Sequence, residues 1–194
     1  MSTGPKQLAL PLIALSRDLA QRVSDEAGGE DCVLGDTRVL LSVISPDAVD
    51  SSLASADGIL LLIRHLDSNS LDQAKALLGK LPNAATHIAI CRAETDVEFK
   101  MSCPSCRQKL WIRDADVGRN GRCPHCKIAF VLPSPEDHLR SVFEWPNSDP
   151  LLRIIMDRPV SCRDALEVLA NTIVARRAAA LSATKRIQLS DDPS

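Results

Sequence analysis

The hydrophobic pattern in the first half of the chain predicts alternating helices and strands. Apolar residues recur every three or four positions over 11–27, which predicts an amphipathic helix that ends at Gly28-Gly29. Short β-prone runs at 32–34 and 39–44 flank a glycine-containing turn and predict an antiparallel hairpin. The small residues of 47–56 indicate a helical turn.

A parallel crossover is predicted next along the chain. The run Gly58 to Ile63 is apolar on both faces, as a central strand of a parallel sheet requires. A helix from Ser70 to the residues before Pro82 and a strand over 86–91 follow it. Strand, helix and strand at this spacing form a right-handed crossover, so residues 1–98 predict the first part of an α/β domain.

The last third of the chain is expected to complete this domain. The apolar run Leu151 to Met156 can be read as a strand or as a helix. Ser161 and Asp164 resemble a capping box, and the apolar positions after them predict a helix to about residue 181. Residues 134–189 are assigned to the α/β domain, and 190–194 to a disordered tail.

Charge divides the chain into unlike parts. The 194 residues are 45% hydrophobic with a net charge of -2, which excludes general disorder. Residues 1–98 carry a net charge of -6, residues 99–131 of +5 and residues 132–194 of -1. The longest apolar runs fall far short of the roughly 20 residues of a membrane helix, and Leu8 to Leu15 has no cleavage site after it. We therefore expect a cytoplasmic protein with no membrane span.

The basic segment holds the strongest chemical motif of the sequence. Cys103-Pro104-Ser105-Cys106 and Cys123-Pro124-His125-Cys126 are two Cys-x-x-Cys pairs separated by 16 residues. Each pair can present two thiolates in a tight turn, and two pairs complete the tetrahedron that zinc prefers. A β-prone run follows each pair. The motif predicts a zinc ribbon with one Zn(II) per chain, held by Cys103, Cys106, Cys123 and Cys126.

Other roles for the cysteines fit the sequence less well. Thioredoxin-like redox chemistry uses one reactive pair at a helix N-terminus, whereas two matched pairs followed by strands do not provide it. His125 lies between two ligands and is expected to be exposed, because four thiolates already fill the tetrahedron. Cys32, Cys91 and Cys162 are interpreted as small core residues.

The segment Phe99 to Pro133 resembles the bacterial and archaeal CPxC…CPxC zinc-ribbon family, the zinc finger/thioredoxin domain. The likeness rests on an aromatic residue before the first pair, an Arg-Cys-Pro-x-Cys second pair and an aromatic-valine-proline ending. Where the family often has glycine after each pair, this chain has Arg107 and Lys127. The resemblance implies that residues 99–133 bind zinc, and it implies no reaction.

The basic side chains of the ribbon form a candidate nucleic-acid or partner surface. With Trp111 and Phe130 nearby, they would neutralise phosphates while the aromatic rings stack on bases. The basic residues are Arg107, Lys109, Arg113, Arg119, Arg122 and Lys127. The alternative, which the sequence favours, is that these charges solvate a small domain and Trp111 packs behind the metal.

The remaining elements resemble the middle of a small Ras-like GTPase. The likeness rests on the hairpin 32–44, the strand 58–63, the helix 71–81 and the strand 86–91. Ser161-Cys162-Arg163 also precedes the last helix, where such proteins carry Ser-Ala-Lys. This resemblance implies an α/β scaffold into which the zinc ribbon is inserted.

The residues that would bind a nucleotide depart from the GTPase pattern. On this resemblance, Gly4-Pro5-Lys6-Gln7 would be a degenerate phosphate loop that lacks its first strand, and no metal-binding Ser or Thr follows Lys6. Cys91-Arg92-Ala93-Glu94 would stand at the guanine-reading position. The implied scaffold is therefore degenerate and free of nucleotide.

The sequence as a whole predicts an α/β protein in which a small, mostly parallel sheet with flanking helices carries an inserted β zinc ribbon. His65, His87 and His138 are isolated, and no nucleophilic arrangement can be placed, so we expect no enzyme. The interpretation is a cytoplasmic bacterial protein that acts in protein–protein interaction or regulation. A nucleic-acid-binding zinc-ribbon protein is the alternative, and a nucleotide-binding or hydrolysing enzyme comes third.

Overall fold

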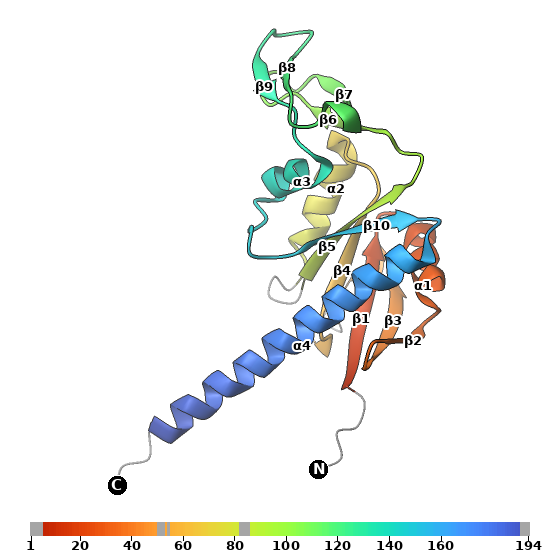
Figure 1. Cartoon of the computed structure of the whole chain (residues 1–194), viewed down its shortest axis with the longest axis vertical. Coiled ribbons are helices and arrows are strands. Elements are labelled where there is room, and N and C mark those ends of the chain that lie inside the picture. The colour runs from red at the N-terminus through yellow and green to blue at the C-terminus, as the bar shows by residue number, and fades with distance from the viewer. Residues whose placement is uncertain (1–5, 50–52, 54, 82–85, 191–194) are drawn as a thin grey trace.

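A six-stranded sheet forms the body of the protein, and the predicted α/β class is confirmed. The computed structural model describes residues 6–49, 53, 55–81 and 86–190, with 183–190 described by their backbone alone. The strand order is β10-β5-β4-β1-β3-β2, with every neighbouring pair parallel except β2 and β3 (Figure 1). The ribbon projects beyond the carboxyl ends of the parallel strands, because it follows directly after β5.

The elements of this body agree with most of the predicted pattern. The strands are β1 (Lys6–Ala14), β2 (Asp31–Leu34), β3 (Thr37–Ile44), β4 (Ile59–Ile63), β5 (Thr86–Ala93) and β10 (Leu151–Met156). The helices are α1 (Arg17–Ala27), α2 (Ser68–Leu78), α3 (Pro135–Phe143) and α4 (Pro159–Ser190). The hairpin, the central strand and the crossover predicted from the sequence are therefore present.

The prediction of a helix from Pro11 is wrong, because the segment up to Ala14 is strand β1. Leu12, Ile13 and Ala14 are fully buried between β3 and β4, as suits a strand buried on both faces. Pro11 lies where β1 pairs with β3 but not yet with β4, a position where a missing N–H is tolerated. The helix begins only at Arg17.

Two apolar cores lie on the two faces of the sheet. One core joins the sheet to α1 and α4, and the other joins it to α2 and α3. The second core also takes in Phe99, Met101, Leu110 and Ile112 from the ribbon. The ribbon is therefore packed against the α/β domain through its first hairpin.

The segment after the ribbon completes the sheet that begins before it. Leu151–Met156, which the pattern left open, is strand β10 and pairs in parallel with β5. Ser161 does not cap the last helix, since its Oγ accepts the backbone N–H of Ile155 at 3.0 Å. Helix α4 begins earlier, at Pro159, and continues past the predicted end to Ser190 (Figure 1). The tail at 191–194 lies outside the described residues.

Three local features differ from the prediction. Helix α2 begins at Ser68 because Asp67 caps it by accepting the backbone N–H of Ser70. Helix α3 was missed, although Ser134 and Asp137 form a capping box at its start. The turn predicted over 47–56 is a short 3-10 helix at Pro46–Ala48, and part of that range lies outside the described residues. Within the described part of the chain, no helix has both the length and the apolar character needed to cross a membrane.

Candidate metal centre

Two short hairpins carry the four clustered cysteines. Strands β6 (Glu98–Ser102) and β7 (Lys109–Arg113) are antiparallel, as are β8 (Asn120–Arg122) and β9 (Ala129–Val131). One Cys-x-x-Cys pair forms the turn of each hairpin. The two turns are therefore equivalent supports for two sulfur atoms each.

The backbone of the two turns follows one pattern. In the first turn the N–H of Cys103 donates to the carbonyl of Gln108 at 2.8 Å, and the N–H of Arg107 donates to the carbonyl of Cys103 at 3.0 Å. The second turn repeats both bonds with distances of 2.9 and 3.0 Å. This repetition explains why the two proline-containing pairs match in sequence.

The residue after each cysteine pair adopts the left-handed conformation. Arg107 has φ 59° and Lys127 has φ 63°. Glycine enters this region freely, whereas another residue loses about 1 kcal/mol there. This backbone accounts for the glycine often found at these positions in the family that the segment resembles. In this chain Arg107 and Lys127 occupy these two positions, although glycine would be less strained there.

The four sulfur atoms converge on one point. All four lie within 4.8 Å of one another, and the Cys103–Cys126 and Cys106–Cys123 separations are each 3.7 Å. A tetrahedron with metal–sulfur bonds of about 2.3 Å has sulfur–sulfur edges of about 3.8 Å. A disulfide needs about 2.05 Å, and all four residues are free cysteines. The geometry fits a metal ion and not a pair of disulfides.

Backbone donors favour thiolates in this cluster. The N–H of Cys106 donates to the Cys103 sulfur and lowers the pKa of that thiol to about 6. The N–H of Ile128 lowers the pKa of Cys126 in the same way. At Cys106 the N–H of Gln108 acts in that direction too, but desolvation and the three neighbouring sulfurs together outweigh it and raise the pKa of Cys106 to about 12. Four thiolates therefore need a cation among them, which a divalent metal supplies.

A buried arginine fixes the ribbon to the end of β5. Arg92 is 6% exposed and donates to both carboxylate oxygens of Asp114 at 2.9 Å. It also donates to the carbonyls of Asp96 at 2.6 Å and Glu98 at 3.3 Å, and lies over the ring of Phe99. Because these partners span the link into β6 and the turn after β7, Arg92 sets the position of the metal site relative to the sheet.

The predicted basic surface is divided between two sides of the ribbon. Its six members are exposed: Arg107, Lys109, Arg113, Arg119, Arg122 and Lys127. Trp111 and Phe130, expected to serve one surface, line different cavities, and Arg107 shares the cavity of Phe130. Asp116 joins Arg113 and Arg119 at 2.8 and 3.2 Å.

The expectation that Trp111 packs behind the metal is wrong. Trp111 is 60% exposed, because alternation along β7 buries Leu110 and Ile112 and turns the indole outward. Lys100, which the sequence reasoning missed, lies opposite Trp111 with its Nζ 4.3 Å from the ring centroid. The alternation of β6, with Phe99 and Met101 buried, was the signal that places Lys100 outward.

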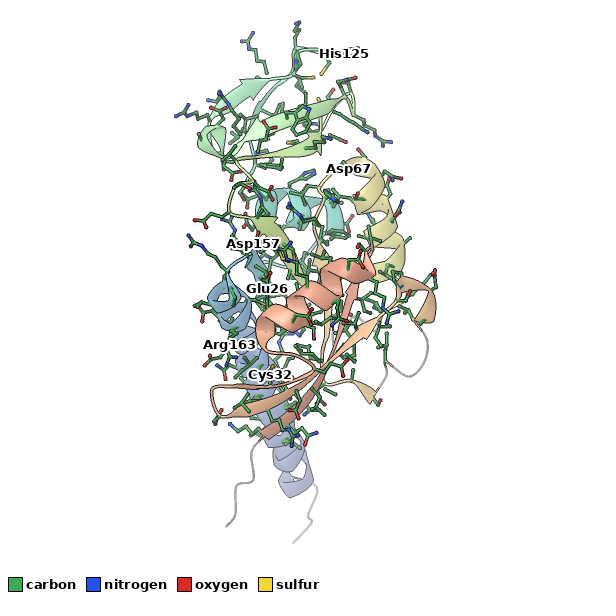
Figure 2. All side chains as sticks on the ribbon, turned by 90° about the vertical axis from the view of Figure 1, so that its right-hand side faces the viewer. Glu26, Cys32, Asp67, His125, Asp157 and Arg163 are labelled. Carbon is green, nitrogen blue, oxygen red and sulfur yellow. The ribbon has the colours of Figure 1, made fainter. Side chains whose placement is uncertain are left out.

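The other predicted cysteines and His125 lie as expected. His125 is exposed at the tip of the ribbon, at the far end from the sheet (Figure 2). Cys32, Cys91 and Cys162 are buried in the core that α1 and α4 cover. Burial raises the pKa of all three thiols, that of Cys162 to about 12, so they remain protonated.

The isolated histidines occupy unlike places. Burial lowers the pKa of His87 to about 4, and it also lowers the pKa of His138. Both are buried and stay neutral, as core histidines do. His65 is exposed and lines cavities at the carboxyl edge of the sheet.

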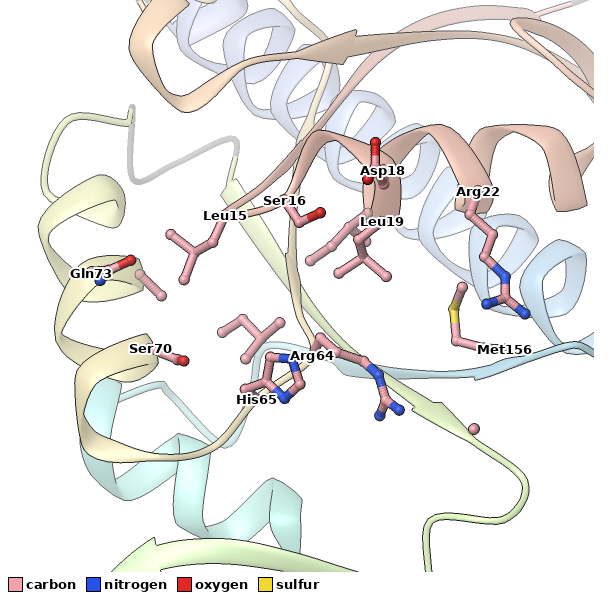
Figure 3. Close-up of a pocket in the computed structure, with 14 residues that line it drawn as sticks. Leu15, Ser16, Asp18, Leu19, Arg22, Arg64, His65, Ser70, Gln73 and Met156 are labelled. Atoms are coloured by element: carbon pink, nitrogen blue, oxygen red, sulfur yellow. The ribbon is translucent and has the colours of Figure 1, made fainter.

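A cavity of about 400 Å³ lies at this carboxyl edge, between α1 and α2. Figure 3 shows Leu15 and Ser16 on one side of it, Gln73 on another and His65 beneath. The location corrects the phosphate-loop assignment, because Lys6 and Gln7 belong to β1 and the connection from β1 to α1 is Leu15-Ser16.

This connection lacks the chemistry of a phosphate loop. It contains no glycine, and the side chain of Ser16 makes no capping hydrogen bond. Asp18 adds a negative charge in the first turn of α1, where a phosphate would need the positive end of the helix. Gly4 and Pro5 lie outside the described residues. A first strand is present, contrary to the prediction.

Comparison of the chain with known proteins adds nothing to the four-cysteine pattern. No protein-family profile matches the chain, and no curated protein matches it at a significant level.

Proposed function

We propose that the chain is a zinc-binding, non-catalytic protein whose ribbon is a recognition surface on a degenerate GTPase-like scaffold. The convergence of four cysteine sulfurs at tetrahedral spacing carries the proposal. Cys103, Cys106, Cys123 and Cys126 would hold the ion, and the ion would join the two hairpin turns and stabilise the second hairpin, whose strands bury no residue.

Zinc is the proposed metal because the donor set is four thiolates with no place left for a substrate. Structural zinc sites have closed tetrahedral shells of this kind, and catalytic ones keep a position open. A tetrahedral four-sulfur site also suits iron, so the metal has to be identified by experiment. The remaining support is the β-hairpin around each pair, which gives the ribbon layout that the sequence resembles.

Cobalt substitution tests the site. Purified apoprotein titrated with Co(II) should reach saturation at one ion per chain, with the visible absorption of tetrahedral thiolate coordination. The Cys123→Ser variant should shift or lose these bands, whereas Cys32→Ser, a change outside the site, should not. Octahedral spectra, or equal spectra for Cys123→Ser and the unmodified chain, would refute the proposal.

The scaffold is proposed to be non-catalytic. The order of hairpin, central strand, helix and parallel strand supports the GTPase-like resemblance. The connection after β1 and Asp18 oppose polyphosphate binding, which counts against the nucleotide-using enzyme. Calorimetric titration with Mg-GTP and Mg-ATP should give no heat of binding, and micromolar affinity for either would contradict this part of the proposal.

Two partner classes fit a zinc ribbon, protein and nucleic acid. The sequence favours a protein partner, and it favours the reading that the basic residues only solvate a small domain, in part on the expectation that Trp111 packs behind the metal. The exposure of Trp111 removes that part of the argument and favours nucleic acid as a second candidate, since an exposed indole among cations suits base stacking beside phosphates.

A further inference from the structure

The outer face of the β6–β7 hairpin presents one aromatic ring among cations. In this antiparallel pair Lys100 lies opposite Trp111, Ser102 opposite Lys109 and Glu98 opposite Arg113. Directly opposite residues share a face of the sheet, so the indole stands among three basic side chains and one acidic one. We call Lys100, Lys109, Trp111 and Arg113 the indole face.

The indole face is held in place from behind. The alternate residues of both strands, Phe99, Met101, Leu110 and Ile112, are buried in the core shared with α2 and α3. A rotation of the hairpin would expose these four residues, so Trp111 is kept toward solvent. Solvent exposure of Trp111 forgoes the stabilisation that burial of its large apolar ring would give. Tryptophan is enriched at surfaces where proteins bind partners.

Two acidic groups beside the indole face are neutralised, whereas Glu98 lies on the face itself, opposite Arg113. Asp114 is bound by buried Arg92, and Asp116 is shared by Arg113 and Arg119. Lys100 lies over the indole, yet Trp111 remains 60% exposed. The local surface is therefore positive, although the chain as a whole carries a net charge of -2.

A cavity of about 300 Å³ opens at the foot of Trp111. Its walls include Lys100 and Trp111 from the ribbon, His65 and Asp67 from the segment after β4, and Arg64, whose guanidinium is bound by Asp96. Figure 2 places Asp67 at the end of α2 that faces the ribbon. Mixed donors and acceptors suit the edge of a base, whereas the carboxylates here disfavour a phosphate.

We propose that the indole face binds single-stranded nucleic acid, with one base stacked on Trp111, its neighbour in the adjoining cavity and phosphates along the three cations. A duplex hides the faces of its bases, so stacking on Trp111 requires a single strand. The inference names the partner of the ribbon and rests on the proposed function, since the hairpin needs its metal-held turn.

Fluorescence and anisotropy test this assignment on the zinc-loaded full chain. The protein has two tryptophans, so the Trp145→Phe variant leaves Trp111 as the only indole. Labelled oligouridylate and oligothymidylate of about ten nucleotides should bind and quench the Trp111 emission. Log affinity should fall with log salt with a slope of about -2, as three phosphate contacts on a single strand predict.

Variants separate stacking from general charge. Trp111→Ala should weaken binding at least about tenfold, and Trp111→Phe should retain more of it. The double variant Lys100→Ala, Lys109→Ala should bind oligonucleotides of every sequence more weakly, by similar factors, and its log affinity should depend less steeply on log salt. Lys80→Ala, an exposed lysine elsewhere on the chain, is the matched control and should change nothing.

Three results would overturn the assignment. They are no binding of either oligonucleotide at about 50 mM salt, equal binding by Trp111→Ala, and a duplex that binds as tightly as its single strand. The first would leave a protein as the partner of the indole face, the second would place the oligonucleotide elsewhere on the chain, and the third would show phosphate contacts without base stacking. Zinc content measured on the same preparation keeps the outcomes apart, because zinc-loaded protein without oligonucleotide binding rejects only this inference, whereas absent zinc rejects the proposed function.

Discussion

The sheet and the ribbon lie side by side in one chain but are stabilised by different means. All five residues of β4 are buried, and neither β8 nor β9 contains a buried residue. The sheet can hold its shape by burying aliphatic side chains, whereas the second hairpin depends on its cysteines. The ribbon buries one face of its first hairpin and no strand residue of its second. Its outward positions therefore stay available for basic and aromatic side chains.

Metal removal should have the largest effect of the changes considered, and it should destabilise the ribbon and not the sheet. The Cys103→Ser and Cys123→Ser double variant, or chelation, should abolish ordered structure in β8 and β9, which bury no residue, because structural zinc contributes about 10 kcal/mol or more to folding in small domains. Hydrogen exchange read by mass spectrometry should show rapid exchange in 118–131, partial protection in β6 and β7, and retained protection in β1, β4 and β5. Equal loss of protection in both regions would break the distinction between them.

A substitution in the core should destabilise the sheet and leave metal binding by the ribbon unchanged. Leu61→Ala removes a fully buried side chain from β4 and should destabilise the sheet by about 3 kcal/mol in denaturant unfolding. Metal content below the unfolding transition should be unchanged. Val33→Ala, at an exposed position, is the matched control and should cost little. Loss of metal from folded Leu61→Ala protein would show that the two regions are not independently stabilised.

The junction between the two regions depends on Arg92. Arg92→Met should cost about 2 kcal/mol, because it leaves Asp114 and two backbone carbonyls without a charged donor. Exchange protection at 96–99 should fall, while Co(II) spectra stay the same. Arg158→Ala, which removes an exposed ion pair with Glu94, should cost about 0.5 kcal/mol or less. If the two variants lost equal free energy of unfolding, Arg92 would not anchor the ribbon to the sheet.

The smallest expected effect is an increase in the stability of the ribbon. Arg107→Gly relieves a left-handed residue and should raise the thermal stability of the ribbon by about 0.5 to 1 kcal/mol. Lys127→Gly has the same relief but loses the bond from its Nζ to the carbonyl of Pro124, so it should gain less. A loss of stability in Arg107→Gly would show that this side chain supports the turn.

The sequence predicts elements well where one pattern dominates. The clustering of the four cysteines follows from their spacing alone, and the run of β4 is apolar at every position. The first strand was misread because Leu12, Leu15, Leu19 and Val23 repeat with helical spacing across a strand and a helix that happen to adjoin. Periodicity cannot tell such a junction from one element, and only pairing with β3 and β4 decides it.

Side-chain placement around the site was less predictable than the ligands. The expectation that Trp111 packs behind the metal is wrong because its outward direction depends on the register of β6 against β7. Arg92 gave no signal, since its partners lie 4 to 22 residues away in a segment without periodicity. Register and ion pairing between distant segments are tertiary facts, so spacing along the chain does not contain them.

Metal analysis of the unmodified protein, purified without added metal, tests the central claim most directly. The account predicts one zinc per chain by mass spectrometry of the native protein, with Cys103, Cys106, Cys123 and Cys126 protected from alkylation until a chelator is added. Protein that contains no zinc while these four thiols react at once, or protein that contains iron in its place, would contradict it.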